Sequence, residues 1–123
     1  MSNAEADKIS DRLLDFAARI GKVVDALPDT RLGRHIAGQL VRSATAPMAN
    51  YEETRAGESR ADFVHKLGIA LKEFRETRGW LRLIVTSGLI TERKMTPLIV
   101  ECEELTRILA KSIVTARRRI KDN

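Results

Sequence analysis

The sequence predicts an all-α protein, an antiparallel up-down-up-down four-helix bundle formed by a single domain over residues 1–123. Three observations support this fold class. Apolar residues recur at alternating spacings of four and three in four successive segments, as in helices with one buried side. Proline or glycine marks each of the short stretches between these segments. Aromatic residues are only 4% of the chain although 43% is hydrophobic, so mainly aliphatic side chains must fill the core between the helices.

The first helix is expected over residues 7–27. Pro28 ends it, because proline disfavours helical geometry in the preceding residue. Asp29 and Thr30 can then cap the next helix. The predicted core stripe of the first helix is Ile9, Leu13, Phe16, Ile20, Val23 and Leu27.

The second helix is expected to end near Ala56 and Gly57, where glycine can adopt the left-handed closing conformation. Pro47 lies inside it and removes one backbone hydrogen bond, at a cost of about 3 kcal/mol unless the helix bends. We therefore predict a kink at Pro47. The predicted core stripe is Leu32, Ile36, Leu40, Ala44, Met48 and Tyr51.

The third helix is the clearest element and is expected over residues 60–87, from a cap at Ser59 to a stop at Gly88. Heptad spacing predicts that its buried side consists of Phe63, Leu67, Ala70, Phe74, Thr77, Leu81 and Ile84.

The fourth helix has two possible starts. Thr91 and Glu92 form one candidate cap, and Thr96 followed by Pro97 forms another, which would leave residues 91–95 as a separate turn. Its predicted core stripe is Leu98, Cys102, Leu105, Leu109, Ser112, Ala116 and Ile120.

Composition excludes several classes of protein. No apolar run approaches the roughly 20 residues that span a bilayer, so we expect no membrane helix. A single cysteine and an N-terminus without an apolar signal segment predict a cytoplasmic protein. Only His35, His65 and Cys102 offer soft metal ligands, and none is paired in a metal-binding motif. We therefore expect no metal site and no cofactor, with Cys102 acting as a small core residue.

The net charge of +5 is concentrated in the second half of the chain. The basic side chains near the C-terminus can neutralise phosphates and bind RNA or DNA with little sequence preference. The alternative is a solvated C-terminal turn whose cations favour the helix dipole. The candidate nucleic-acid-binding residues are Arg107, Lys111, Arg117, Arg118, Arg119 and Lys121.

The third helix carries a second stripe almost opposite its core stripe. A large ring beside aliphatic residues and opposite charges suits a subunit contact, whereas scattered apolar residues on a solvated surface are the ordinary alternative. The candidate interface residues are His65, Ile69, Trp80 and Leu83.

A run of residues in the second and third helices resembles the four-helix bundle family of the protein encoded in intervening sequences of 23S ribosomal RNA genes. The helical layout extends the resemblance over about residues 8–116, and Pro47 departs from the family pattern. The matched positions are Arg42, Ser43, Ala49, Asn50, Tyr51, Glu53, Asp62, Phe63, His65, Lys66, residues 69–73, residues 75–78, Trp80 and Leu81.

The resemblance implies a ring-forming homo-oligomer, because the family is similar to pentamers such as the accessory variability determinant proteins of diversity-generating retroelements. Those proteins bind a reverse transcriptase and nucleic acid, so a partner protein is a further expectation. The family itself implies no settled activity.

Several polar residues that match the family are interpreted as structural. Opposite charges at these spacings can form ion pairs and hydrogen bonds between helices that fix their register. This predicted polar network consists of Arg42, Asn50, Glu53, Glu73, Glu76 and Arg78.

Arg60 and His65 support an alternative, because their spacing resembles the motif of dimeric HEPN ribonucleases. Histidine can transfer a proton near neutral pH, and arginine can stabilise a phosphorane-like charge. The spacing is short and common, however. We therefore predict a non-catalytic homo-oligomeric scaffold or adaptor that binds nucleic acid through a basic surface, with the HEPN-like ribonuclease as the alternative.

Overall fold

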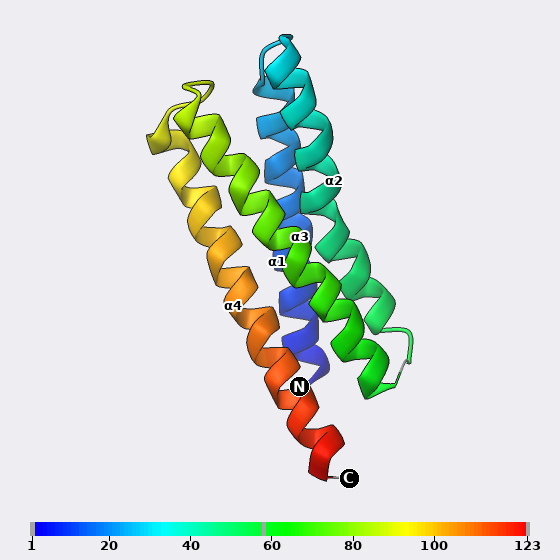
Figure 1. The fold of residues 1–123 in the computed structure, drawn as a ribbon. Helices are drawn as coiled ribbons and strands as arrows, with labels where there is room; N and C mark the ends of the chain where they lie inside the picture. Colours follow the sequence, from blue (N-terminus) through cyan, green and yellow to red (C-terminus); the bar gives the residue numbers. More distant parts are fainter. Residues whose placement is uncertain (1, 58, 123) are drawn as a thin grey trace.

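The structure is a computed structural model that describes residues 2–57 and 59–122. It consists of four helices: α1 (Asn3–Ala26), α2 (Arg31–Thr54), α3 (Arg60–Thr86) and α4 (Glu92–Asp122), with no strand among the described residues. Figure 1 shows each helix running in the opposite direction to the one before it. The predicted four-helix bundle is therefore confirmed, and α1 begins four residues earlier than expected.

Side-chain caps begin the first three helices. The hydroxyl groups of Ser2, Thr30 and Ser59 accept hydrogen bonds from backbone amides three residues later, over 3.2, 3.0 and 3.2 Å. These contacts satisfy amides that have no partner inside a helix. They explain why each helix begins where it does.

The fourth helix begins at the earlier of its two predicted starts. The carbonyl of Thr91 accepts hydrogen bonds from the amides of Lys94 and Met95, so α4 is already formed before Pro97. Proline is tolerated this early because few amides of the first turns have helical partners. Residues 91–95 therefore do not form a separate turn.

Three glycines are required by the chain path, and Gly57, just after α2, has the left-handed conformation that the sequence predicts, with a φ of +87°. Gly88 has a φ of +70°, a conformation that L side chains rarely adopt, and it ends α3 as predicted. Gly33 packs directly onto the connection before α2. A Cβ atom at this position would lie 2.1 Å from the carbonyl oxygen of Pro28, so any larger residue would push the connection away.

The core lies along the centre of the bundle. Phe16 of α1 and Phe74 of α3 meet there edge to face, with ring centroids 5.8 Å apart. Each helix contributes residues from the predicted stripe, and from α3 these are Leu67, Ala70, Phe74, Thr77, Leu81 and Ile84. Buried aliphatic packing of this kind is the main source of stability in a bundle.

Three predicted core positions are wrong. Leu32, in the first turn of α2, is 41% exposed, and Ile120 is 42% exposed because α4 continues past the end of the bundle (Figure 1). Ser112 is only half-buried, and Ile113 takes the core position instead. A period of 3.6 residues lets either neighbour turn inward, and the apolar one does.

Pro47 is buried inside α2, which is continuous from Arg31 to Thr54. The helix is therefore not broken there, and the kink stays a prediction. No helix in the described part of the chain is long and apolar enough to cross a membrane.

Candidate nucleic-acid interface

Helix α3 presents three arginines at the spacing of one helical face, Arg75, Arg78 and Arg82. Nε of Arg78 donates to Oε2 of Glu103 on α4 over 3.2 Å. Within the described residues Arg75 and Arg82 form no ion pair. Two uncompensated guanidinium groups thus flank one that is already neutralised.

Helix α4 adds a further arginine beside them. Arg75, Arg78 and Arg107 line one surface depression of about 240 Å³, together with Thr106. A neighbouring depression of about 300 Å³ is lined by Arg78 and Arg82 and by the carboxylates of Glu92 and Glu103. We call the surface formed by Arg75, Arg78, Arg82 and Arg107 the α3–α4 basic face.

The basic residues predicted on α4 do not form one cluster. Arg107 lies on the α3–α4 basic face, and helical spacing places Lys121 on the same side of α4. The consecutive residues Arg117 to Arg119 project about 100° apart around the helix. All six predicted cations are exposed, and none has an ion-pair partner in the part of the chain that the structure describes.

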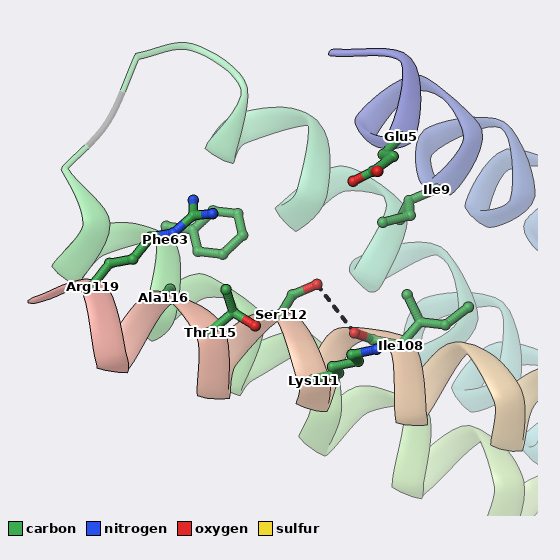
Figure 2. A pocket seen from close by; sticks show the side chains of 9 residues that line it. All are labelled: Glu5, Ile9, Phe63, Ile108, Lys111, Ser112, Thr115, Ala116 and Arg119. Atoms are coloured by element: carbon green, nitrogen blue, oxygen red, sulfur yellow. Dashed lines mark hydrogen bonds between the residues drawn. The ribbon is translucent and has the colours of Figure 1, made fainter. Parts of the chain in front are cut away.

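Lys111 and Arg119 instead line a separate groove (Figure 2). We call it the α1–α4 groove. It lies between the start of α1, the start of α3 and the second half of α4, and its volume is about 560 Å³. Ile9 and Phe63 form part of its apolar surface.

Sequence reasoning missed Arg75 and Arg82. Their spacing of seven residues, with Arg78 between them, places all three arginines on one side of a helix, and this pattern is visible in the sequence. It was obscured because the same helix also carries acidic residues. Only the packing of α3 against α4 reveals that these arginines join Arg107.

The predicted polar network is found in part between α2 and α3. Arg42 donates to Oε2 of Glu73 over 2.9 Å and also pairs with Glu76. Nε1 of Trp80 donates to the same Glu76 carboxylate over 3.0 Å. The Arg42 side chain is 49% exposed, so these pairs fix register more than they add stability.

The remaining members of the network are separate from this cluster. Glu53 pairs with Lys66 across α2 and α3 over 3.2 Å, and Arg78 pairs with Glu103 across α3 and α4. Asn50 is half-buried on α2, and its side chain makes no hydrogen bond to another described residue.

The four candidate interface residues differ in their surroundings. Trp80 is half-buried, with its ring centroid 5.7 Å from that of His35 on α2, and Leu83 also packs against the core. Ile69 and His65 are exposed. The chain itself therefore covers part of Trp80, and the subunit contact stays a prediction.

Arg60 and His65, the residues of the ribonuclease alternative, are both exposed at the start of α3. Five positions along a helix correspond to a rotation of about 140°, so the two residues lie on different sides of α3. No hydrogen bond joins their side chains.

Cys102 is buried against α3, and its thiol donates to the carbonyl oxygen of Phe74 over 3.4 Å. Burial raises the pKa of the thiol to about 12, because the thiolate would be poorly solvated. Cys102 thus belongs to the core. Among the described residues, no group of three or more His, Cys, Asp or Glu side chains is placed to hold a metal ion.

Comparisons with known proteins identify the family. The sequence pattern of the family described as 23S rRNA-intervening sequence protein matches residues 5–111. A crystal structure of a protein of unknown function, from the S23 ribosomal protein family of Bacteroides thetaiotaomicron VPI-5482, superimposes with a TM-score of 0.81. The two proteins are 33% identical, over 88% of this chain and 96% of that one. No curated protein matches the chain. The chain therefore belongs to the 23S rRNA-intervening sequence protein family.

Proposed function

We propose that the protein is a non-enzymatic, self-associating scaffold or adaptor that binds RNA or DNA through the α3–α4 basic face. The observation that carries this proposal is that Arg75 and Arg107, from two helices, line one depression and Arg82 lines the neighbouring one, all three without ion-pair partners among the described residues. Arginine forks match phosphate oxygens well. A face of this kind favours contact with a phosphate backbone.

The expected binding is electrostatic and tolerant of sequence. Each arginine that neutralises a phosphate releases condensed counterions, so the affinity must fall as salt rises. Phe74 is the only aromatic residue lining the two depressions, and it is fully buried. Base stacking is therefore not expected, and backbone contacts dominate.

Charge reversal tests the nucleic-acid interface. The affinity of the wild-type protein for a labelled RNA strand and a labelled DNA duplex is measured by fluorescence anisotropy at fixed salt. We expect the double variant Arg75→Glu/Arg82→Glu to bind at least about tenfold more weakly, because two phosphate contacts are replaced by repulsion.

The matched control is Lys22→Glu/Arg31→Glu, which changes the net charge equally. Both of its positions are exposed, on α1 and α2, and neither lines the depressions of the α3–α4 basic face. We expect an affinity within about threefold of wild type, since long-range charge is largely screened by salt. Equal losses in the two double variants would contradict a defined interface.

Self-association is proposed through the exposed side of α3 around Ile69, which is 38% exposed, and the half-buried Trp80. An apolar residue beside a large ring suits the centre of an interface. Sedimentation equilibrium at micromolar concentration should show an oligomer, with a pentamer as the expected size. Ile69→Glu should shift the protein toward monomer, whereas Val100→Glu, at an exposed position of α4, should not. A monomeric wild-type protein would contradict this part of the proposal.

The absence of catalysis has its own test. RNA incubated with the protein should stay intact, because Arg60 and His65 lie on different sides of α3. RNA cleavage by the wild-type protein that His65→Ala abolishes would overturn the non-enzymatic assignment in favour of the ribonuclease.

A further inference from the structure

The α1–α4 groove has an apolar surface drawn from three helices. Ile9 of α1 and Ala116 of α4 are 9% and 7% exposed, and Phe63 of α3 and Ile108 of α4 are half-buried. Figure 2 shows these residues around the hollow left between the helices. The groove lies where α1 and α4 meet. These two helices contact each other less extensively than the helices of the pairs α1–α2, α2–α3 and α3–α4. The half-buried Phe63 and Ile108 therefore leave apolar surface that another molecule can contact.

The polar residues of the groove give it a positive charge. Lys111 and Arg119 line it from α4, and neither has an ion-pair partner in residues 2–57 and 59–122. Glu5 is the single acidic residue of the lining. The hydroxyl of Ser112 donates to the carbonyl oxygen of Ile108 over 3.1 Å and is already satisfied. The groove thus combines an apolar surface with two uncompensated cations.

The apolar surface continues beyond the groove. Ile120 follows Ala116 by one helical turn on the same side of α4 and is 42% exposed. Figure 1 shows that the C-terminal end of α4 extends past the other helices. A molecule lying in the groove could cover Ile120 as well.

We propose that the α1–α4 groove docks an acidic amphipathic helix of a partner protein. Helices bind apolar grooves through side chains spaced three and four residues apart. The groove follows α4 from Ile108 to Arg119, about 16 Å, which accommodates several turns of a partner helix. Acidic residues beside the apolar anchors would complement Lys111 and Arg119.

This occupant fits the groove better than a small ligand or a nucleic acid. The groove is open to solvent along α4, where Lys111, Thr115 and Arg119 are exposed, whereas a small-molecule site encloses most of its ligand. A phosphate backbone would satisfy the cations but has no apolar side chains to place against Ile9 and Phe63. The groove shares no lining residue with the depressions of the α3–α4 basic face, so its binding is separate from the proposed nucleic-acid binding.

Fluorescence anisotropy with a labelled peptide tests the proposal. The probe is a helical peptide of about 16 residues, with Leu at every third or fourth position and Glu on the remaining side. A comparison peptide has Lys in place of each Glu. We expect the wild-type protein to bind the acidic peptide at least about tenfold more tightly than the basic one, because the cations of the groove discriminate between them.

Two matched pairs of variants locate the binding. Thr115→Trp fills the groove from an exposed position, and we expect at least about tenfold weaker binding, whereas Val114→Trp next to it should change affinity by less than about twofold. Arg119→Glu in the groove should weaken binding about fivefold, and Arg118→Glu outside it less than about twofold. Circular dichroism checks that each variant is folded.

Four outcomes would overturn the proposal. They are no binding of the acidic peptide, equal affinity for the basic peptide, equal losses within each matched pair, and reduced self-association on Thr115→Trp, which would identify a second copy as the occupant. Arg75→Glu/Arg82→Glu should leave peptide binding unchanged. A failure of the proposed nucleic-acid interface can therefore be distinguished from a failure of the peptide groove.

Discussion

Two contacts between neighbouring helices are built differently. The α2–α3 seam contains a buried pair of hydroxyls, Thr77 and Ser43, whose oxygens are 2.8 Å apart. Arg42 closes its outer side with Glu73 and Glu76. Polar groups on one helix of this seam thus meet complementary groups on the other.

The α1–α4 edge is closed only in part. Arg12 of α1 pairs with Glu101 and Glu104 of α4 over 2.7 and 3.2 Å. Toward the C-terminal end of α4 these matched pairs stop, and the α1–α4 groove opens beside Lys111 and Arg119. The difference is that polar groups of the α2–α3 seam are matched across the two helices, whereas α4 carries cations such as Lys111 and Arg119 that have no ion-pair partner among the described residues.

The largest expected effect is the difference in stability loss between truncating a core ring and truncating a ring at the edge of the α1–α4 groove. Phe74→Ala should lower the free energy of unfolding by about 3–5 kcal/mol, because it leaves a cavity where the ring meets Phe16. Phe63→Ala, at the half-buried edge of the groove, should cost less than about 2 kcal/mol. Urea denaturation followed by circular dichroism measures both. Similar losses would mean that the groove is as essential to the fold as the core.

A smaller difference in stability is expected between valine substitutions of a buried threonine and of an exposed one. Thr77→Val should cost about 1–3 kcal/mol, since it removes the hydroxyl that lies 2.8 Å from both Ser43 Oγ and the Glu73 carbonyl oxygen. Thr115→Val, in the groove, should change stability by less than about 0.5 kcal/mol. The same denaturation experiment compares them. A costly Thr115→Val would show that the groove contributes to stability.

The burial of Cys102 between α3 and α4 makes the stability of the fold depend on pH. Cys102 has a pKa of about 12 when folded, against an ordinary value of 9.0, so between these values the unfolded chain loses a proton that the folded chain keeps. The stability present below pH 9 is therefore lost as pH rises, by about 1 kcal/mol between pH 9 and 10. Burial also raises the pKa of the Tyr51 hydroxyl. The stability difference between wild type and Cys102→Ala, measured at several pH values, separates the effect of Cys102 from that of Tyr51, which both proteins share. A difference that stays constant with pH would contradict the burial of the thiol.

The smallest effect compares the half-buried Arg12 ion pair of the α1–α4 edge with the exposed Arg42 ion pairs of the α2–α3 seam. Arg12→Ala and Arg42→Ala should each cost less than about 1 kcal/mol, because water and salt screen both guanidinium groups. The free energies of unfolding are measured at low and at high salt. The difference between each variant and wild type should shrink as salt rises. A loss well above that limit for Arg12 alone would show that the α1–α4 edge depends on its ion pairs.

The fold was largely predictable because helical periodicity records which residues face inward. Phe74 and Thr77 were assigned to the core from heptad spacing alone, and Ser59 was recognised as a cap. The failures at Leu32 and Ile120 have a different cause. Both residues continue an apolar stripe at the end of a helix, where the sequence does not tell whether a neighbouring helix reaches that level.

The candidate sites were less predictable than the core. The basic residues of α4 could be found as a cluster in the chain, but how they divide between two sides of the helix depends on its rotation within the bundle. Arg75 and Arg82 gain their significance only beside Arg107. The groove likewise depends on the spacing between α1 and α4, which no local sequence pattern encodes.

The salt dependence of nucleic-acid binding tests the proposed function most directly. The affinity for a labelled DNA duplex is measured at several salt concentrations for the wild-type protein and for Arg75→Glu/Arg82→Glu. If these arginines neutralise phosphates, the slope of log affinity against log salt should be shallower in the variant by about 2. Equal slopes in the two proteins would contradict phosphate binding at the α3–α4 basic face.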